Sequence, residues 1–338
     1  MSARLRMIEP DKVYEVVSGT VDRQFLFRPN GHPLNPLLDE SCPADALAPQ
    51  NDHIPKPSIL NILGYAFARA LELKPVRLHA AEQNINHIHS CLSADNNHLG
   101  NISEFYKVAH SIIAREINRL YDREGHVFAG KLRVTVCEDD ASAESKLIYG
   151  ITNVVKDGLL DRQTGQVFLS MFPALAKGQK QKFWKIDWRQ FYKKGGFRKK
   201  SHHPKDYMIW RELDVAWLPE YLNWSESKRQ TRIRKQVASV TDAIGEIHKR
   251  EGKTPLGVSG LKSLDPRSRP KNPRNRTRKP LFHASSKETA KAYKERYRQF
   301  ANQYISASAD FRNGDYQREF PHGSYRPPLM KICTADEM

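Results

Sequence analysis

The sequence predicts an α+β protein with a basic, mainly helical and partly disordered C-terminal extension. Two observations lead to this fold class. Over about the first 160 residues, stretches rich in β-branched and aromatic residues alternate with stretches whose apolar residues recur at helical spacing. Beyond that point the chain becomes strongly basic. With 338 residues, of which 39% are hydrophobic, the chain can build a core in one large domain or two ordinary ones.

The first predicted elements are a strand region, a loop and a helix. Residues 12–28 are β-branched and aromatic on both sides of a Ser-Gly-Thr turn, so they predict a strand or a strand pair. Residues 29–57 are rich in proline and polar residues and predict a loop insertion. Ser58 is a suitable N-cap for a helix, because apolar residues follow it on one helical stripe. These residues are Ile59, Ile62, Leu63, Ala66 and Ala70.

Extended and helical segments then alternate. An extended run begins after Pro75 and continues to residue 93. Apolar residues at helical spacing predict a helix over 102–120. A turn leads from there into a short strand within 126–139, and a further helix is predicted over 142–156.

The extension changes composition along its length. Residues 180–205 hold ten Lys or Arg interleaved with six aromatic residues, and 231–250 have the spacing of an amphipathic helix. Residues 266–280 hold seven basic residues and no apolar one, which predicts disorder. Ser285 or Ser286 opens a last helix. The predicted domains are a first domain at 1–165, a basic aromatic and helical extension at 166–250, a disordered basic linker at 251–284, and a C-terminal helix and tail at 285–338.

The charge balance indicates a polyanionic partner. Lys and Arg number 55 against 38 Asp and Glu, which gives a formal net charge of +17. Nucleic acid is the first candidate and an anionic membrane surface the second. No apolar run is long enough to span a bilayer, and the N-terminus lacks the apolar segment of a signal peptide. The four cysteines are widely spaced, so we expect a reducing cytoplasm. We also expect no membrane and, because of the positive charge, association with the nucleoid through DNA.

Two histidines stand out in the extended run. His87 and His89 are two residues apart, and side chains with this spacing on a strand point the same way. Both imidazoles can therefore reach one point above a sheet and supply two ligands of a metal site. A pair of surface histidines is the alternative explanation, because thirteen histidines make chance pairs common.

A tyrosine and an asparagine follow on a predicted helix. Tyr149 and Asn153 are four residues apart, so they lie on one helical face. Tyr149 is a candidate nucleophile and Asn153 a candidate third metal ligand. The alternative is that Tyr149 packs in the core and Asn153 caps the helix.

Together these motifs resemble the HUH single-tyrosine transposases, in particular the branch of REP-associated tyrosine transposases. The resemblance rests on three motifs in matching order. The first is Asn-His-Ile-His at 86–89, and the second is Phe-Ala-Gly-Lys-Leu-Arg at 128–133. The third is Tyr149 with Asn153, followed by Gly158.

The resemblance covers about residues 5–165 and implies both a fold and a chemistry. The fold is an antiparallel sheet with helices, of the ferredoxin-like or RRM-like HUH nuclease type. Tyr149 would attack a phosphate of single-stranded DNA near a hairpin and form a 5′-phosphotyrosine link. Mg²⁺ or Mn²⁺ held by His87, His89 and Asn153 would bind that phosphate. A homodimer is left open.

Several basic residues are candidates for contacts with DNA. Lys131 and Arg133 are two apart on a predicted strand and could line the path of the DNA backbone, or form a solvated face. In the basic aromatic stretch, cations can neutralise phosphates while rings stack on unpaired bases. The candidates there are Lys193, Lys194, Arg198, Lys199 and Lys200. At least half of the aromatic residues in this stretch are instead expected to form a small core with the 231–250 helix.

Three other functions remain open at this stage. One is a related HUH nuclease, either a replication initiator or a relaxase, although no helicase phosphate loop occurs in the chain. Another is a domesticated, non-catalytic DNA- or RNA-binding protein. The family's prolines beside the histidine and tyrosine motifs are replaced here by Ile85 and Val154, which is compatible with a divergent copy. The third is a basic globular protein with a chance pair of histidines.

Overall fold

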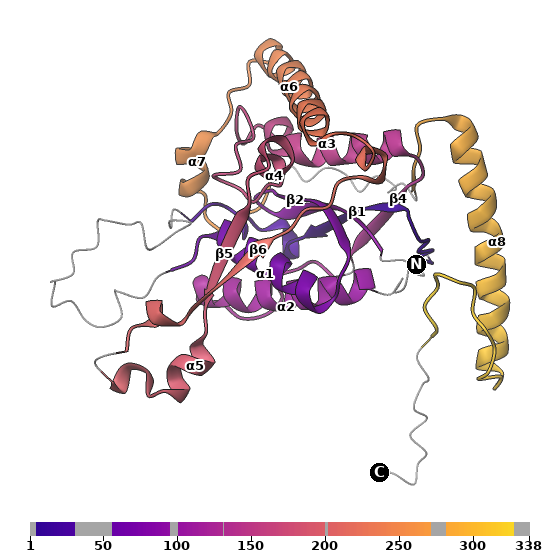
Figure 1. The fold of residues 1–338 in the computed structure, drawn as a ribbon, viewed down its shortest axis with the longest axis horizontal. Coiled ribbons are helices and arrows are strands. Elements are labelled where there is room, and N and C mark those ends of the chain that lie inside the picture. The colour runs from indigo at the N-terminus through magenta and orange to yellow at the C-terminus, as the bar shows by residue number, and fades with distance from the viewer. Residues whose placement is uncertain are drawn as a thin grey trace, which may run out of the picture.

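A computed structural model of the chain describes residues 5–30, 56–94, 101–130, 132–199, 202–271 and 282–327. Its centre is a five-stranded sheet in the order β2-β3-β1-β4-β7 (Figure 1). The first four of these strands are antiparallel to their neighbours, and β7 pairs with β4 in parallel. The predicted α+β class is confirmed. The strands are β1 (Val13–Gly19), β2 (Arg77–Gln83), β3 (His87–Ser93), β4 (Arg133–Cys137) and β7 (Phe282–His283).

Helices cover both faces of this sheet. Helices α1 (Ile59–Leu73) and α2 (Asn101–Leu120) lie on one face, and α3 (Asp140–Lys156) lies on the other (Figure 1). Side chains alternate between the two faces along β3. Tyr106 and His110 of α2 approach the face that carries Ser90 of β3 and Ser18 of β1. His89 is on the opposite face, toward α3.

Two segments that the sequence predicts to be extended differ from expectation in their number of strands. The extended run that follows Pro75 is a hairpin, because the Asn84 amide oxygen accepts from the backbone N–H of Ile85 and makes a tight turn between β2 and β3. In 12–28 only β1 is a strand. Asp22 and Arg23 have φ angles of 48° and 58°, so the chain turns there and forms no second strand.

Capping residues set the starts of the helices. The side chain of Ser58 accepts a hydrogen bond from the backbone of Asn61, which confirms the predicted cap of α1. Helix α3 begins two residues before the expected start at Ser142, because Asp139 and Ser142 form a capping box. After α3 the chain turns at Gly158, whose φ of +68° favours glycine.

The basic aromatic stretch forms a small second sheet. Strands β5 (Gln181–Ile186) and β6 (Met208–Leu213) pair in an antiparallel hairpin, and α5 (Trp188–Lys193) lies between them in sequence. Phe183 packs on Gly64 of α1 so closely that a Cβ at this glycine would lie 2.5 Å from its ring. The expectation that these aromatic residues form a core with the 231–250 helix is therefore wrong, since Phe183 and Trp184 are buried against α1.

The long helices of the extension pack on the first half of the chain. Helix α6 (Glu226–Arg250) lies over α3 and α4 (Phe172–Lys177), and α8 (Lys287–Arg312) follows β7 at the edge of the sheet (Figure 1). Helix α6 starts before the expected 231 because Ser225 caps it.

The predicted loop and linker fall largely on residues that the structure does not describe. Of the loop at 29–57, only 29–30 and 56–57 are described. The expected disordered linker at 251–284 has secondary structure in its described part, namely α7 (Gly257–Ser263) and β7. Leu261 explains α7, because it is fully buried in an apolar cluster with Ile85 and Phe168.

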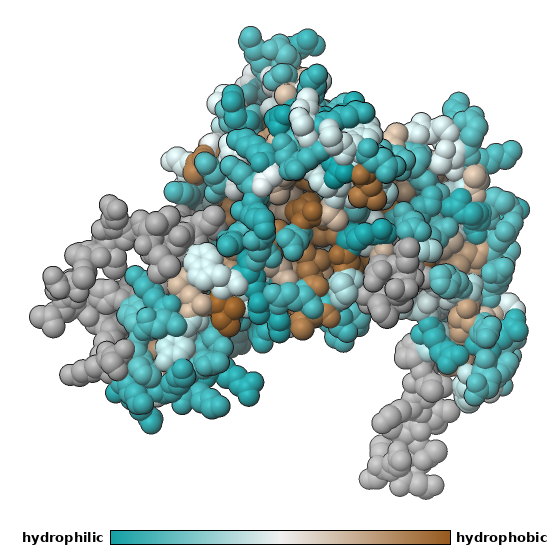
Figure 2. Space-filling view, in the orientation of Figure 1, coloured by the Kyte–Doolittle hydropathy of each residue, from teal (hydrophilic) through white to brown (hydrophobic). Residues whose placement is uncertain are grey.

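On the face shown in Figure 2, most of the surface is polar or charged, and apolar side chains gather near its middle. Across the described residues, no helix has the length and apolar character needed to cross a bilayer.

Candidate active site

The paired histidines of β3 converge on one point, as their spacing predicts. Their ring centroids are 4.9 Å apart, and the Nε2 atoms of His87 and His89 are separated by 3.1 Å. His89 is buried and His87 is half-buried. The two imidazoles are therefore neighbours on the α3 face of the sheet, not separate surface residues.

Helix α3 brings the tyrosine and the asparagine to the same place. The amide nitrogen of Asn153 lies 3.0 Å from Nε2 of His87. One turn earlier, the ring of Tyr149 meets His89 edge-on, with centroids 5.4 Å apart and an interplanar angle of 81°. The structure thus brings together the four residues that the sequence singled out, although His87 and Asn153 are 66 residues apart in the chain.

Hydrogen bonding and burial prepare His87 to bind through Nε2. Its Nδ1 lies 2.7 Å from the amide oxygen of Asn86, so Nδ1 carries the proton and Nε2 offers a lone pair. Burial lowers the pKa of His87 well below its usual value, and the positive charges of His89, Arg133 and Arg23 lower it further. His87 is therefore neutral at neutral pH, which is the state that ligates metal.

His89 has a carboxylate on its other side. Its Nδ1 lies 3.4 Å from Oε1 of Glu15 on β1, and this buried nitrogen makes no hydrogen bond. Burial alone would raise the pKa of Glu15, but the hydrogen bond from His283, the nearby imidazole of His89 and the charge of Lys146 outweigh it and hold the pKa far below its usual range. Glu15 is consequently a carboxylate throughout the physiological range.

These donors suit a small divalent cation. Two ligands at right angles about an ion with bonds of about 2.1 Å lie about 3.0 Å apart, close to the 3.1 Å and 3.0 Å separations measured around His87. The Asn153 oxygen reaches the position of its nitrogen when the amide turns over. No group of three His, Cys, Asp or Glu able to hold a metal occurs among the described residues, so the third protein ligand would be this amide.

Ammonium groups surround the tyrosine. Lys156 Nζ lies 4.5 Å from the centroid of the Tyr149 ring, and Lys146 Nζ lies 5.2 Å from it. Both lysines are on α3, one turn before the tyrosine and two turns after it. Positive charge at these positions stabilises negative charge on the tyrosine oxygen or on a bound phosphate.

Two adjoining pockets open around Tyr149. One, of about 650 Å³, is lined by the histidines, Asn153 and the basic residues Arg23 and Arg133. The other, of about 670 Å³, lies between α3 and α6 and includes apolar side chains of α6. The residues common to both pockets are Tyr149, Lys156, His248 and Lys253. The tyrosine therefore stands in a continuous basic groove.

No clear sequence pattern marks most of these groove residues. Lys156 was detectable, because it lies seven residues after Tyr149 and so on the same helical face. Arg23, His248 and Lys253 come from irregular segments or from the end of α6, and no local motif marks them. Glu15 alternates with apolar residues in β1 and looks like an ordinary strand residue.

The predicted DNA contacts divide into two groups. Arg133 lines the groove, at the start of β4. In contrast, α5 and the turn after it lie at the far end of the β5–β6 hairpin from α3 (Figure 1). Lys193, Lys194, Arg198 and Lys199, four of the predicted contacts, lie there and are exposed. Lys131 and Lys200 lie outside the described residues.

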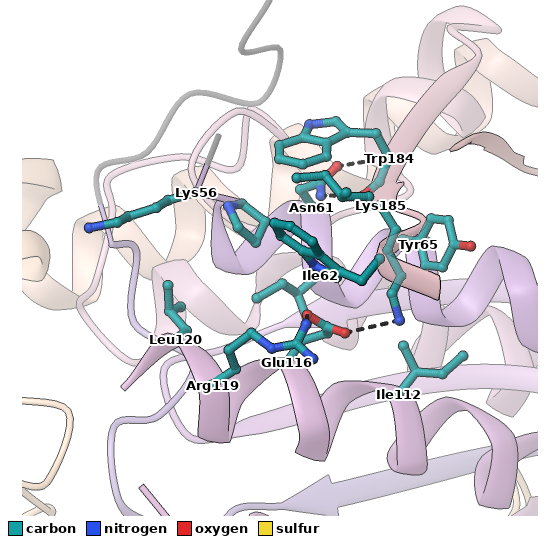
Figure 3. A pocket seen from close by; sticks show the side chains of 13 residues that line it. Lys56, Asn61, Ile62, Tyr65, Ile112, Glu116, Arg119, Leu120, Trp184 and Lys185 are labelled. Carbon is teal, nitrogen blue, oxygen red and sulfur yellow. Dashed lines mark hydrogen bonds and ion pairs between the residues drawn. The ribbon is translucent and has the colours of Figure 1, made fainter. Parts of the chain in front are cut away.

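A smaller pocket of about 360 Å³ lies between α1, α2 and β5, across the sheet from Tyr149 (Figure 3). Ile62, Tyr65, Ile112 and Trp184 contribute to its lining. An ion pair between Glu116 of α2 and Lys185 of β5, 3.0 Å long, joins the two elements beneath it (Figure 3). This pocket shares no residue with the groove around Tyr149.

Comparisons with known proteins give a structural likeness but no match in sequence. No protein family and no curated protein sequence matches the chain. Among solved structures, the chain is similar to a REP-associated tyrosine transposase bound to a REP hairpin, with 13% identity and a TM-score of 0.34. The alignment covers 53% of this chain and 87% of that one.

Proposed function

We propose that this protein is a metal-dependent tyrosine transposase that cleaves and rejoins single-stranded DNA near hairpins. One observation carries the proposal. Nε2 of His87 lies 3.1 Å from Nε2 of His89 and 3.0 Å from the Asn153 amide, beside a tyrosine, in a basic groove. Chance histidines on a surface have no reason to converge with a tyrosine and an amide supplied by a separate helix.

His87, His89 and Asn153 are the residues that would hold Mg²⁺ or Mn²⁺. A divalent ion bound there would polarise the scissile phosphate. The protein's own part is to direct the two imidazole Nε2 atoms at one point, because Asn86 and Glu15 face the two Nδ1 atoms. The donor set contains nitrogen and oxygen and no thiolate, which favours a hard ion over a structural zinc.

Tyr149 would supply the attacking oxygen. A bond forms between this oxygen and phosphorus, the bond from phosphorus to the 3′ oxygen breaks, the phenolic proton is lost to solvent, and the departing 3′ oxygen takes up a proton from solvent. Lys146 and Lys156 favour the loss of this proton because they stabilise the resulting charge. The products are a 5′-phosphotyrosine link and a free 3′-hydroxyl. The reverse attack by a 3′-hydroxyl rejoins a strand without ATP, since one phosphodiester replaces another.

The groove supplies contacts to the strand. Arg23, Arg133 and Lys253 offer positive charge to phosphates near the tyrosine. Ile244 and Ile247 of α6 give the adjoining pocket apolar surface on which unpaired bases could lie. A single strand passing the tyrosine would have one of these pockets on each side of the scissile phosphate.

The test is an adduct assay with the full chain. Labelled single strands that carry a hairpin are incubated with the protein and Mn²⁺ and resolved on a denaturing gel. A protein–DNA adduct that needs Mn²⁺ and a strand-joined product are expected. Cleavage with an adduct but no strand joining would instead indicate a replication initiator or relaxase. Binding without an adduct would indicate a non-catalytic DNA- or RNA-binding protein.

A further inference from the structure

Glu15 is a buried carboxylate in the middle of the central strand, and it lies between two histidines. Its Oε1 is 3.4 Å from Nδ1 of His89, and its Oε2 is 2.8 Å from Nε2 of His283. The Glu15 side chain is only 6% exposed. A carboxylate in a sheet interior is costly unless its oxygens are paired, so each contact here requires an explanation.

His283 reaches this position from the far end of the chain. It belongs to β7, which pairs in parallel with the edge strand β4. The backbone N–H of Glu138 donates to the His283 carbonyl at 2.9 Å, and the N–H of Ser285 donates to Asp139 at 2.8 Å. These bonds fix the backbone on both sides of the imidazole, so the position of His283 is set by the docking of β7.

Helix α8 anchors β7 against the first residues of the chain. Arg296 of α8 pairs with Glu138 at 2.7 Å, and the Tyr297 hydroxyl donates to the carbonyl of Leu5 at 3.1 Å. The ring of Phe282 packs against Tyr293, with centroids 4.6 Å apart. The segment from β7 to α8 is therefore built into the edge of the catalytic sheet, although β7 lies within the predicted disordered linker.

We propose that Glu15 is the positioning residue of His89 and that His283 holds Glu15 in place. On this proposal the C-terminal segment, β7 with α8, is a component of the metal site. The inference rests on the proposed metal-binding role of His89. It adds that this role requires Glu15 and His283, which are 268 positions apart in the chain. Neither Glu15 nor His283 lines the groove around Tyr149, so both act through His89.

The physical reason is control of the His89 ring. A carboxylate that accepts a hydrogen bond from Nδ1–H leaves the Nε2 lone pair free to bind a metal ion. The same hydrogen bond makes Nε2 more basic. The Glu15 carboxylate is itself free to turn unless its second oxygen is held. The hydrogen bond from His283 supplies that hold at 2.8 Å. Loss of His283 would let Glu15 turn away from His89, and the ring would lose its fixed direction.

The test measures Mn²⁺ affinity of the full chain in the absence of DNA, by titration calorimetry. Glu15→Gln keeps the shape of the side chain but removes its charge, and we expect about a 10- to 100-fold weaker affinity. His283→Leu should weaken binding in the same direction, and His283→Gln should restore part of it because the amide can still donate. In the Glu15→Gln background, His283→Leu should have no further effect.

Two results would overturn the proposal. The first is independent action, in which the losses from Glu15→Gln and His283→Leu multiply in the double variant. The second is an equal loss in Lys185→Gln, a control that removes the ion pair between β5 and α2 and leaves Glu15, His283 and α8 untouched, since that result would indicate general loosening. Thermal unfolding without metal verifies that each variant is folded.

The same experiment separates this inference from the proposed function. Wild-type Mn²⁺ binding that His87→Ala weakens, with no change in Glu15→Gln, would overturn the positioning role and leave the transposase proposal standing. If the variants weaken Mn²⁺ binding as expected but the wild type forms no DNA adduct, the proposed cleavage is overturned and the positioning role stands. A wild type that binds no Mn²⁺ would overturn the metal site on which both depend.

Discussion

The candidate catalytic residues lie in the groove around Tyr149, whereas most of the predicted DNA-binding cations lie in residues 181–213, the β5–α5–β6 module. In the groove the polar groups are buried or half-buried and contact one another at 2.7–3.1 Å. In the module, Lys193, Lys194, Arg198 and Lys199 are exposed. Attack on a phosphate requires fixed geometry, which regular elements and hydrogen bonds provide. Neutralising phosphates requires only accessible charge.

The largest expected effect separates the chemistry of the groove from its packing. Tyr149→Phe removes the attacking oxygen, so adduct formation should fall below detection, by at least about 10³-fold. The ring contact with His89 should survive, because the ring is unchanged. Stability should change by roughly the value of one hydrogen bond, 0.5–1.5 kcal/mol. The adduct gel and a denaturant titration measure the two effects.

A matched control for this variant is Tyr192→Phe in the module, where the tyrosine is exposed. It should retain the adduct. An adduct that persists in Tyr149→Phe and maps to Tyr106 or Tyr121 would contradict the assignment. Tyr106 is a poor candidate, since it is buried on α2, across the sheet from the groove, and burial raises its pKa.

The second prediction concerns the metal ligands. The double change His87→Ala and His89→Ala removes both imidazoles, so divalent-dependent cleavage should disappear while DNA binding persists. Binding persists because the basic residues supply it through phosphate contacts. Cleavage is measured with and without Mn²⁺, and binding by fluorescence anisotropy.

The control for the histidines lies in the module. His202→Ala with His203→Ala removes an adjacent pair of histidines that does not reach the groove. Cleavage should be unchanged in this variant. Equal cleavage by the wild type and by the His87 and His89 double variant would rule out the metal site.

The third prediction tests the module and has a smaller effect. Changing Lys193, Lys194, Arg198 and Lys199 together to Gln should weaken DNA binding and reduce the slope of log K against log salt, by up to about 0.7 for each phosphate contact to a single strand. The Mn²⁺-dependent cleavage of bound DNA should continue. Point changes are needed here, because truncation after residue 165 would also remove Phe183 from α1 and β7 from the sheet.

Helix α8 provides a control with the same change in net charge. Its exposed residues Lys287, Lys291, Lys294 and Arg312 can be changed to Gln together. An equal loss of salt dependence in this control would show that the total charge of the protein matters and the position of the module does not.

What the sequence could predict follows from the range of each interaction. The spacing of His87 and His89 on a strand, and of Tyr149 and Asn153 on a helix, is local, so the face each pair occupies was predictable. The caps of α1 and the α+β class were predictable for the same reason. These interactions depend on a few consecutive residues.

Interactions between distant segments could not be predicted in this way. The contact of Glu15 with His283 depends on β7 pairing with β4, and β7 is a two-residue strand without any alternating pattern. The basic aromatic stretch was expected to pack with α6 but packs on α1, because Gly64 leaves space for Phe183. A glycine inside a helical pattern does not reveal which ring will fill the space beside it.

The smallest expected effect concerns α6, the part of the C-terminal half that forms one wall of the groove. Arg232 of α6 makes hydrogen bonds of 2.6 and 2.8 Å to both carboxylate oxygens of Glu144 on α3, and the Tyr221 hydroxyl also contacts this carboxylate. Hydrogen bonding from Arg232 lowers the pKa of Glu144 below its usual value, against an opposing effect of burial. The pair joins α6 to the helix that carries Tyr149.

We expect Arg232→Gln to cost about 0.5–1 kcal/mol of unfolding free energy at neutral pH, because the arginine side chain is 41% exposed and solvent screens the pair. A carboxyl whose folded pKa is lowered stabilises the protein above its unfolded pKa, and that stabilisation is lost as pH falls through the folded pKa. The difference between Arg232→Gln and the wild type should therefore shrink as the pH falls below about 4.5. Thermal unfolding at a series of pH values measures it. A difference that stays constant across this range would mean that Arg232 stabilises α6 by packing, and the two halves of the molecule would then be joined at this point without help from charge.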